Sequence, residues 1–212
     1  GNGVTSNGKS PVAVNTSGVL AGKTVIAIAA VGAYSMALTS EGKVYTWGLN
    51  NRGNLGNNSF INSLVPLPVD TSGALNGKTV VAIAAYSQSL ALDSEGRLYA
   101  WGPDRGGLGT GISGAADIPV PVAVTTNGAL AGKMVVGLSA GTENMALTSE
   151  GKIFTWGHNL NGAVGAGLSR RVIDDANAPI PVDTSGVLVR QAVSAISAGG
   201  DSTVVIAAPD TF

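Results

Sequence analysis

The sequence predicts an all-β protein, a β-propeller built from four-stranded antiparallel blades. A unit of about 55 residues recurs along the whole chain, and each copy divides into four short strand-like segments. The composition agrees with this architecture, because 31 glycines and 9 prolines among 212 residues, 44% apolar but only 12% charged, are typical of short strands joined by turns. We therefore expect small sheets arranged around a common axis.

Three of the repeat units are whole, and a fourth is divided between the two ends of the chain. The divided unit lacks the segment that corresponds to Lys43–Trp47. We therefore expect either a piece of a longer propeller or a protomer that completes its ring with another chain, and a self-closed ring of four units stays open as an alternative. We interpret the chain as one propeller domain or a fragment of one, residues 1–212, with units 1–23 (tail only), 24–78, 79–133, 134–191 and 192–212 (head only).

Two features of each unit predict the order of its strands. The segments Tyr34–Thr39 and Lys43–Trp47 flank the turn Ser40-Glu41-Gly42, as in a β-hairpin. The fourth segment always carries proline, as at Pro66, and is expected at the outer sheet edge because proline cannot donate a ladder hydrogen bond. The Ala-rich first segment, Thr24–Ala30, is then expected at the inner edge, where the sheets converge.

The third segment and the loop after it carry the most specific residues of the repeat. Each third segment ends in Trp-Gly, and each following loop contains an apolar residue followed by Gly. Three such stretches in register resemble repeats of the regulator of chromosome condensation, and the Thr-Ser-Gly-x-Leu-x-Gly-Lys linker resembles the form common in bacterial, often exported, members. The resemblance implies a ring of seven blades. We expect the tryptophan side chain that ends each third segment to pack between neighbouring sheets. These structural residues are Trp47, Gly48, Trp101, Gly102, Trp156 and Gly157, with the loops 54–56, 107–109 and 163–165.

The resemblance does not carry an activity over to this chain. The founding member of the family promotes nucleotide exchange on the small GTPase Ran through face residues and an inserted wedge, which have no matching positions here. Family repeats usually carry Gly-x-His-Ser before the second strand, whereas residues 33–35, 87–89 and 142–144 read Ala-Tyr-Ser, Ser-Gln-Ser and Thr-Glu-Asn. A regulatory propeller that acts on an enzyme, as a guanine-nucleotide exchange factor or an inhibitor, is therefore kept as the alternative function.

Charge and composition argue against several classes of function. The 12 Lys and Arg nearly cancel the 13 Asp and Glu, so no basic surface for nucleic acid or an anionic membrane is predicted. The absence of cysteine excludes disulfides, zinc–thiolate sites and thiol catalysis. The apolar stretches reach about a third of the roughly 20 residues that a membrane-spanning helix needs. We expect neither a nucleic-acid partner nor a membrane span.

No catalytic, cofactor-binding or metal-binding residue is predicted. His158, the only histidine, stands at the variable position after Trp-Gly and is interpreted as an ordinary loop residue. Glu41 recurs as Glu95 and Glu150 at one turn position, which is typical of a solvated hairpin and not of a paired acid and base. The lysine that ends each linker, Lys23 in the first, is expected to contact neighbouring backbone.

The differences between the units concentrate in three long loops, residues 50–62, 103–118 and 158–178. Because the scaffold requires the residues that recur, these loops are the predicted binding surface. We interpret the protein as a non-enzymatic scaffold without a cofactor, exported or at the surface of a bacterial cell. It is expected to bind a protein partner or to self-associate through open blade edges. The candidate partner-binding residues are Asn50, Arg52, Phe60, Asp104, Arg105, His158, Arg170 and Arg171.

Overall fold

The computed structural model consists of β-strands in four sheets, and it describes residues 1–5, 10–104, 107–112, 116–159, 162–167, 175–200 and 202–209. Three sheets have four antiparallel strands in chain order, and the last is a two-stranded hairpin. The prediction of an all-β chain with four-stranded antiparallel blades is confirmed. The first blade contains β1 (Val25–Val31), β2 (Tyr34–Thr39), β3 (Val44–Gly48) and β4 (Ser63–Pro68); the second β5 (Val80–Ala85), β6 (Ser89–Asp93), β7 (Leu98–Gly102) and β8 (Ile118–Ala123); the third β9 (Val135–Ser139), β10 (Glu143–Thr148), β11 (Ile153–His158) and β12 (Asp175–Pro181); and the C-terminal hairpin β13 (Gln191–Ala198) and β14 (Thr203–Pro209).

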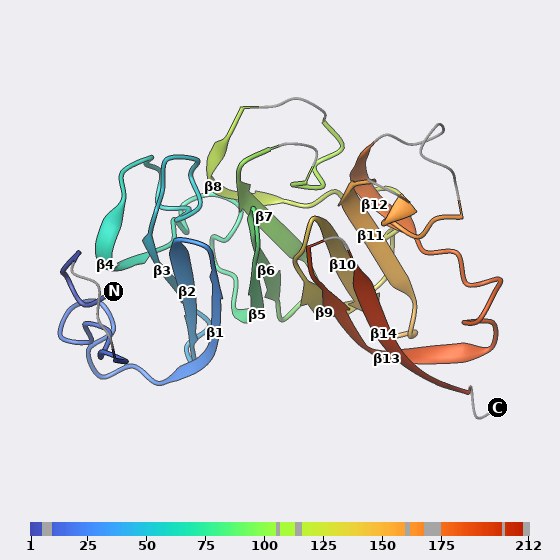
Figure 1. The fold of residues 1–212 in the computed structure, drawn as a ribbon, viewed down its shortest axis with the longest axis horizontal. Helices are drawn as coiled ribbons and strands as arrows, with labels where there is room; N and C mark the ends of the chain where they lie inside the picture. The colour runs from blue at the N-terminus through green and yellow to red at the C-terminus, as the bar shows by residue number, and fades with distance from the viewer. Residues whose placement is uncertain are drawn as a thin grey trace.

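The blades stand side by side in chain order, from the blue first blade to the red C-terminal hairpin (Figure 1). Their first strands are neighbours, because β1 contacts β5, β5 contacts β9 and β9 contacts β13. These strands therefore form the inner side of an arc. The proline-bearing strands β4, β8 and β12 lie at the opposite edge of each sheet, where a missing N–H group costs no ladder hydrogen bond.

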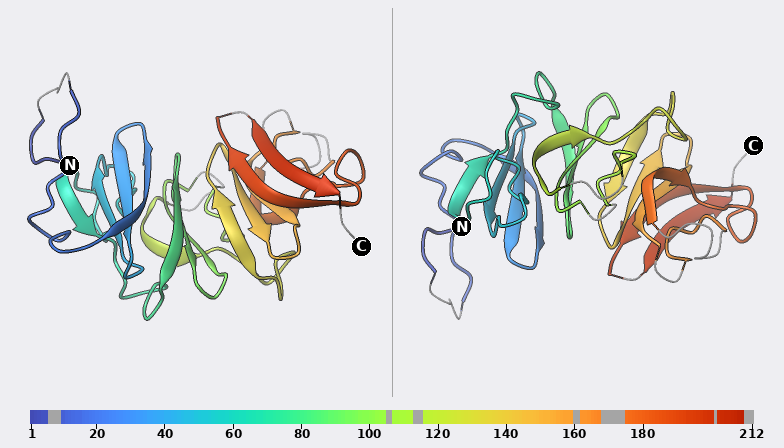
Figure 2. Two further views of the ribbon diagram at one scale, coloured as in Figure 1. Left: turned by 90° about the horizontal axis from the view of Figure 1, so that it is seen from below. Right: turned by 90° about the horizontal axis from the view of Figure 1, so that it is seen from above.

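The arc formed by the described residues is open. Both views in Figure 2 place the first blade at one end and the C-terminal hairpin at the other. Each sheet packs face to face on its neighbours in the sequence, and nothing within the described ranges brings the two ends of the series together. The alternative of a self-closed ring of four units is therefore wrong for this structure.

The apolar core lies between the blades and not inside any one of them. One cluster joins Met36 and Leu38 of the first blade to Ala91 and Trp101 of the second. A second cluster joins the second blade to the third, and a third cluster joins the third blade to the C-terminal hairpin. A single sheet buries an apolar face only against another element, so each blade depends on its neighbours for stability.

The junction between successive blades is centred on a tryptophan. The long loop of the first blade reaches the second blade, where the carbonyl oxygen of Asn54 accepts a hydrogen bond from Trp101 Nε1 at 2.9 Å. Leu55 is buried, and Gly56 lies so close to the indole that a Cβ atom would be 2.5 Å from Nε1. We call this arrangement the loop–tryptophan contact. It requires a glycine, because any side chain would displace the indole.

The loop–tryptophan contact is repeated at the next junction. There the carbonyl oxygen of Gly107 accepts a hydrogen bond from Trp156 Nε1 at 3.1 Å, and Gly109 faces the indole. On the first blade, Gly1 faces Trp47 in the same way, although Trp47 is only half-buried. The segment at the start of the chain therefore lies on the first blade as each long loop lies on the blade after it.

The linker lysines contact carboxylates, so the expectation that they contact backbone is wrong. Lys23 pairs with Glu41 at 2.6 Å, and the pair recurs in the second and third blades at 2.9 and 2.8 Å. Each pair joins the linker before a blade to the β-hairpin turn of that blade. The glutamate side chains are more than half exposed, so solvent screens these pairs and they contribute little to stability.

The loop–tryptophan contact predicts a graded response to three glycine-to-alanine substitutions. Gly56→Ala combines a φ of 62° with the clash on Trp101, and we expect it to lower the free energy of unfolding by about 2–4 kcal/mol. Gly77→Ala has a φ of 68° but open space around it, so the expected loss is about 1 kcal/mol. Gly73→Ala has neither problem and is expected to be neutral or slightly stabilising. Urea unfolding measures the free energy of unfolding of each variant. Equal losses for Gly56→Ala and Gly77→Ala would show that the close approach of Gly56 to Trp101 does not contribute to stability.

Candidate functional site

The long loops of the three blades lie on one face of the arc. Because the strands of each blade are consecutive and antiparallel, the turn after the first strand and the loop after the third strand emerge on the same side. We call this side the loop face. The linkers and the turns that carry Glu41 and its counterparts emerge on the opposite side. The loop face therefore collects the segments in which the blades differ most.

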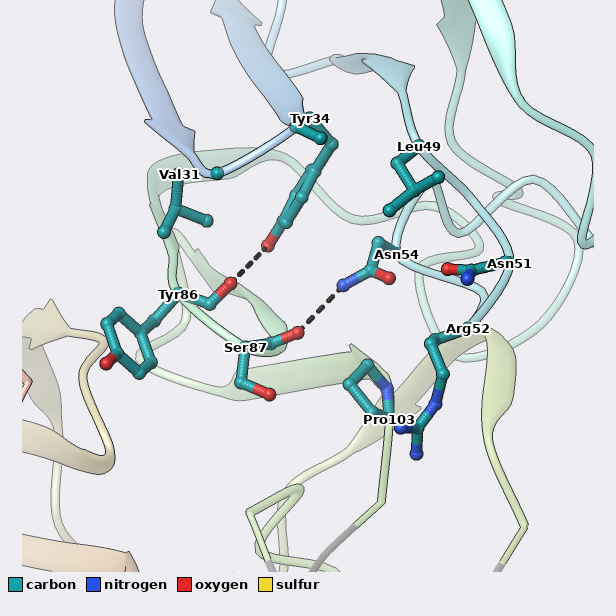
Figure 3. A pocket seen from close by; sticks show the side chains of 11 residues that line it. Val31, Tyr34, Leu49, Asn51, Arg52, Asn54, Tyr86, Ser87 and Pro103 are labelled. Carbon is teal, nitrogen blue, oxygen red and sulfur yellow. Dashed lines mark hydrogen bonds between the residues drawn. The ribbon is translucent and has the colours of Figure 1, made fainter.

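A pocket of about 420 Å³ opens on the loop face between the first and second blades (Figure 3). Its walls come from the β1–β2 turn and the long loop of the first blade, and from the β5–β6 turn and the end of β7 in the second. We call it the first inter-blade pocket. It is lined by Val31, Gly32, Ala33, Tyr34, Leu49, Asn51, Arg52, Asn54, Tyr86, Ser87 and Pro103.

Hydrogen bonds across the junction fix the walls of the first inter-blade pocket. The hydroxyl of Tyr34 donates to the carbonyl oxygen of Gln88 at 3.0 Å and accepts from Ser89 Oγ at 3.1 Å. Asn54 Nδ2 donates to the carbonyl oxygen of Ser87 at 2.8 Å (Figure 3). Burial raises the pKa of Tyr34 to about 12, so its hydroxyl keeps the proton that it donates. The pocket is preformed by these bonds between the blades.

An ion pair between the blades stands at the rim of this pocket. Arg52 Nε and Nη2 contact the two carboxylate oxygens of Asp117 at 2.5 and 2.7 Å, which is a bidentate arrangement. The hydrogen bond to Asp117 raises the pKa of Arg52 above its ordinary value. Arg52 belongs to the long loop of the first blade, whereas Asp117 directly precedes β8 in the second. The guanidinium charge at the pocket is therefore balanced by a carboxylate from the next blade.

A second, smaller pocket of about 190 Å³ opens at the next junction, between the second and third blades. We call it the second inter-blade pocket. Here Gln88 takes the place that Tyr34 has at the first junction, and its Nε2 donates to Asn144 Oδ1 at 2.6 Å. The two pockets are adjacent because they share lining residues. The shared residues are Tyr86, Ser87 and Pro103; the second pocket is completed by Gln88, Gly107, Thr142 and His158.

The two linings offer apolar surface, hydroxyls, amides and backbone groups. Neither lining contains a carboxylate, and Ser87 and His158 both line the second pocket. Among the described residues, no group of three His, Asp or Glu side chains could hold a metal ion. A lining of this kind can recognise side chains and backbone of a bound molecule.

The structure places the predicted binding residues in different settings. Arg52 lines the first pocket and His158 the second. Phe60 is 49% exposed in the long loop of the first blade, outside both linings. Asp104 is almost completely buried, so little of it could touch a partner. Three further predicted residues, Arg105, Arg170 and Arg171, lie outside the described residues.

Asn50 is fully buried, which corrects its assignment to the contact surface. Its Nδ2 donates to the carbonyl oxygens of Ser59 and Ile61 at 2.8 and 3.1 Å, and its Oδ1 accepts a hydrogen bond from the Leu55 amide at 2.8 Å. A short polar side chain that satisfies several backbone groups is a common way to order a loop. Asn50 therefore shapes the long loop from within.

Most of the residues that line the pockets were missing from the predicted site, among them Tyr34, Tyr86, Ser87 and Pro103. For Tyr34, Ser87 and Pro103 a signal was present in the sequence. Tyr34 and Ser87 stand where the Gly-x-His-Ser pattern of the resembling repeats is replaced, and Pro103 occupies the variable position after Trp-Gly that His158 occupies in the third blade. Differences at structurally fixed positions therefore indicated the pockets better than the charged residues of the long loops did.

Family models match most of these repeats. A model described as "Regulator of chromosome condensation (RCC1) repeat" matches residues 41–92 and 150–206, and a second model with the same description matches residues 25–54. The matched residues make up more than half of the chain. The chain belongs to the RCC1 repeat family.

Curated proteins with RCC1 repeats are similar in sequence over most of this chain. The E3 ubiquitin-protein ligase HERC2 of Homo sapiens is 35% identical over 161 residues, 74% of this chain and 3% of that protein. The Regulator of chromosome condensation of Homo sapiens is 31% identical over 179 residues, 82% of this chain and 40% of that protein. The mitochondrial RCC1 domain-containing protein RUG3 of Arabidopsis thaliana is 34% identical over 146 residues, 66% of this chain and 32% of that protein. The chain thus spans less than half the length of these relatives.

Solved RCC1 propellers share the fold. Human WBSCR16 superposes with a TM-score of 0.75 at 24% identity, over 90% of this chain and 46% of that one. Prp20p from Saccharomyces cerevisiae superposes with a TM-score of 0.73 at 22% identity, over 90% of this chain and 45% of that one. The open arc therefore has the blade arrangement of an RCC1 β-propeller. Within the described part of this RCC1 chain, no helix is long and apolar enough to cross a bilayer.

The ion pair at the rim predicts a small and salt-sensitive contribution to stability. Both side chains are partly exposed, so we expect Arg52→Ala to lower the free energy of unfolding by about 1 kcal/mol or less after allowance for solvent screening. A double-mutant cycle with Asp117→Ala, measured by urea unfolding, should give a coupling energy that shrinks at high salt. Coupling that is absent at low salt would show that the pair does not stabilise the junction, and coupling unchanged by salt would show that it does not act through solvent-screened charge.

Proposed function

We propose that the chain is a protein-binding propeller module that contacts its partner with the loop face, through the two inter-blade pockets. The observation that carries the proposal is the adjacency of these pockets, which share Tyr86, Ser87 and Pro103. Two neighbouring concave sites with mixed apolar and polar lining suit two side chains of one partner. The partner residues that enter such pockets are commonly large aromatic or aliphatic anchors.

The distribution of repeated and variable residues supports this proposal. The residues that recur in every blade are used in the loop–tryptophan contact and in the cores between the blades. Residues that differ between the blades line the pockets. The position after Trp-Gly is one example: it is Leu49 in the first blade, Pro103 in the second and His158 in the third, and all three line a pocket. A constant scaffold with a variable surface is typical of a binding module.

Related propellers bind proteins. The crystal structure of Prp20p is described together with its binding properties to Gsp1p and histones, and another structure shows Kap60 bound to yeast RCC1 (Prp20). These partners are properties of those proteins. They support the proposal that the chain acts by protein binding and without catalysis of its own, although one relative is a ubiquitin ligase of which the matched stretch is only 3%.

Two further proposals concern the location of the protein and its self-association. Export or display by a bacterial cell rests on the resemblance of the linker to exported members of the family. Self-association through the open end sheets is a second way for the chain to bind protein, and it does not involve the loop face.

The proposed use of the loop face predicts that one substitution shared by both pockets removes partner binding. Ser87→Arg places a long charged side chain between the two pockets, at an exposed position that should tolerate it. Thr71→Arg is the matched control, because Thr71 is also an exposed hydroxyl residue but lines a hollow next to Glu41, on the opposite face. A partner is first identified by cross-linking and mass spectrometry in the native source and then titrated as a purified protein.

We expect cross-links on the loop face and an affinity that Ser87→Arg weakens about tenfold or more, which corresponds to a loss of about 1.4 kcal/mol or more. Thr71→Arg should leave the affinity unchanged. Equal weakening by both variants, or cross-links confined to the linker side, would contradict the use of the loop face.

A regulatory propeller that acts on an enzyme is the second candidate. The observation that favours it is the 31% identity with the human Regulator of chromosome condensation over 82% of this chain. We expect no acceleration of nucleotide release, because no positions in this chain match the face residues and the inserted wedge through which the founding member of the family acts. Release of a fluorescent GDP analogue from a panel of small GTPases tests this. Acceleration that Ser87→Arg abolishes and Thr71→Arg preserves would establish an exchange factor that works through the loop face.

A further inference from the structure

A hollow of about 310 Å³ lies on the linker side of the first blade, away from the loop face. Three segments form it: the end of the linker before the blade, the β2–β3 turn with the start of β3, and the end of β4 with the residues that follow it. We call it the linker-face hollow. It shares no lining residue with the two inter-blade pockets. The linker-face hollow is therefore a separate concave site.

The charged side chains of the linker-face hollow carry an excess of one positive charge. Lys23 pairs with Glu41 at 2.6 Å, whereas Lys43 makes no ion pair within the described ranges. The hydrogen bond to Glu41 raises the pKa of Lys23 above its ordinary value, so its ammonium group stays charged. Two ammonium groups thus line the hollow with one carboxylate, and a bound anion would balance the remaining charge.

The rest of the lining is mainly apolar. Val44, Pro68 and Val69 contribute aliphatic surface, and Tyr45 adds an aromatic ring. The hydroxyl of Tyr45 also interacts with Lys23, so it lies near the charged groups. A lone charge at an exposed site contributes little to binding, whereas contact with apolar surface is favourable. The ligand that suits this lining therefore carries an apolar group next to its negative charge.

The second blade shows the same arrangement with its charges balanced. Lys78 pairs with Glu95 at 2.9 Å, and Arg97 contacts the same carboxylate at 2.9 Å. The tyrosine of this blade, Tyr99, donates a hydrogen bond to the buried Asp93 at 2.8 Å. The two cations of the second blade are therefore accompanied by two carboxylates, and the tyrosine hydroxyl already has an acceptor. This blade has neither a spare charge nor a free donor for an anion.

The third blade retains the spare charge but lacks the hydroxyl. Lys152 stands where the first blade has Lys43, and within the described ranges it also makes no ion pair. Phe154 stands where the first blade has Tyr45, because each pairs with the corresponding alanine of the second strand. Among the three described blades, the first alone combines an unpaired lysine with a tyrosine hydroxyl.

A preceding blade leaves this part of the molecule open. In the second blade, which the first blade precedes, Lys78 and Glu95 are 19% and 51% exposed. In the first blade, Lys23 and Glu41 are 24% and 54% exposed. The two pairs are almost equally accessible, so a neighbour on that side does not cover them. Access to the linker-face hollow is therefore set by the first blade and its own linkers.

We propose that the linker-face hollow binds a carboxylate that is attached to an apolar group. Lys43 supplies the charge and a charge-assisted hydrogen bond, and the Tyr45 hydroxyl donates a second hydrogen bond to the carboxylate. The apolar lining accommodates the group that carries it. The last residue of a peptide with a free C terminus has this chemistry, and so does a small carboxylic acid. The proposal does not depend on the proposed function of the loop face.

Titrations followed by NMR test the site with matched probes. The probes are the peptide acetyl-Gly-Gly-Leu with a free C-terminal carboxylate, the same peptide with a C-terminal amide, and acetyl-leucine as the small acid. Lys43→Gln removes the spare charge, and Tyr45→Phe removes the hydroxyl but keeps the ring. Lys152→Gln is the matched control, because it makes the same charge change in the third blade. Backbone amide shifts of Val44 and Val69 report binding, and the complete amide spectrum of each variant checks folding.

We expect the free peptide to shift these amides at low salt, and the amidated peptide to bind about fivefold more weakly or worse. Lys43→Gln should weaken binding of the free peptide about fivefold or more, and Tyr45→Phe should weaken it less. Lys152→Gln should leave the affinity unchanged. Acetyl-leucine that binds as tightly as the peptide would support a small acid as the source of the carboxylate, and weaker binding would support a peptide C terminus.

Three results would overturn the proposal. The first is the absence of amide shifts with both carboxylate probes, and the second is equal binding of the free and the amidated peptide. The third is an affinity that Lys43→Gln leaves unchanged, or that Lys152→Gln lowers as much as Lys43→Gln does.

Discussion

The close approach of a glycine to a tryptophan between blades is the constraint on which the rest of the structure depends. Gly56 lies against the indole of Trp101, and Gly109 lies against the indole of Trp156. Each contact carries the long loop of one blade onto the next and sets where that loop leaves the sheet. The walls of the inter-blade pockets come from the same loops. The scaffold and the binding surface are therefore positioned by one interaction that is repeated along the chain.

Much of the fold could be predicted from the sequence because the repeat presents the same local signals several times. Proline in every fourth segment indicated the outer sheet edge, and the structure has β4, β8 and β12 there. The Glu-Gly turns indicated the hairpins between second and third strands. These signals act within a few residues of the chain. Local chemistry, confirmed by its recurrence in three units, was sufficient to predict the order of the strands.

The candidate site could be predicted only in part, because its walls depend on side chains far apart in the sequence. Tyr34 is 55 residues from Ser89, and Arg52 is 65 residues from Asp117, yet both pairs meet at one junction. In neither pair does the local sequence around one residue indicate which distant residue it contacts. Asn50 shows the opposite difficulty, because a polar residue in a variable loop suggested a contact surface, whereas the side chain is used inside the loop.

The location of the apolar core between the blades has a consequence for how the molecule loses structure. In such a series, stability is approximately a sum of terms between nearest neighbours. Among the described residues, the second and third blades each share a core with both of their neighbours, whereas the first blade and the C-terminal hairpin share one on a single side. Backbone amides of the second and third blades should therefore exchange with solvent most slowly, and opening should begin at either end and move inward. The chain then behaves as a linear array whose cooperativity is lowest at its ends.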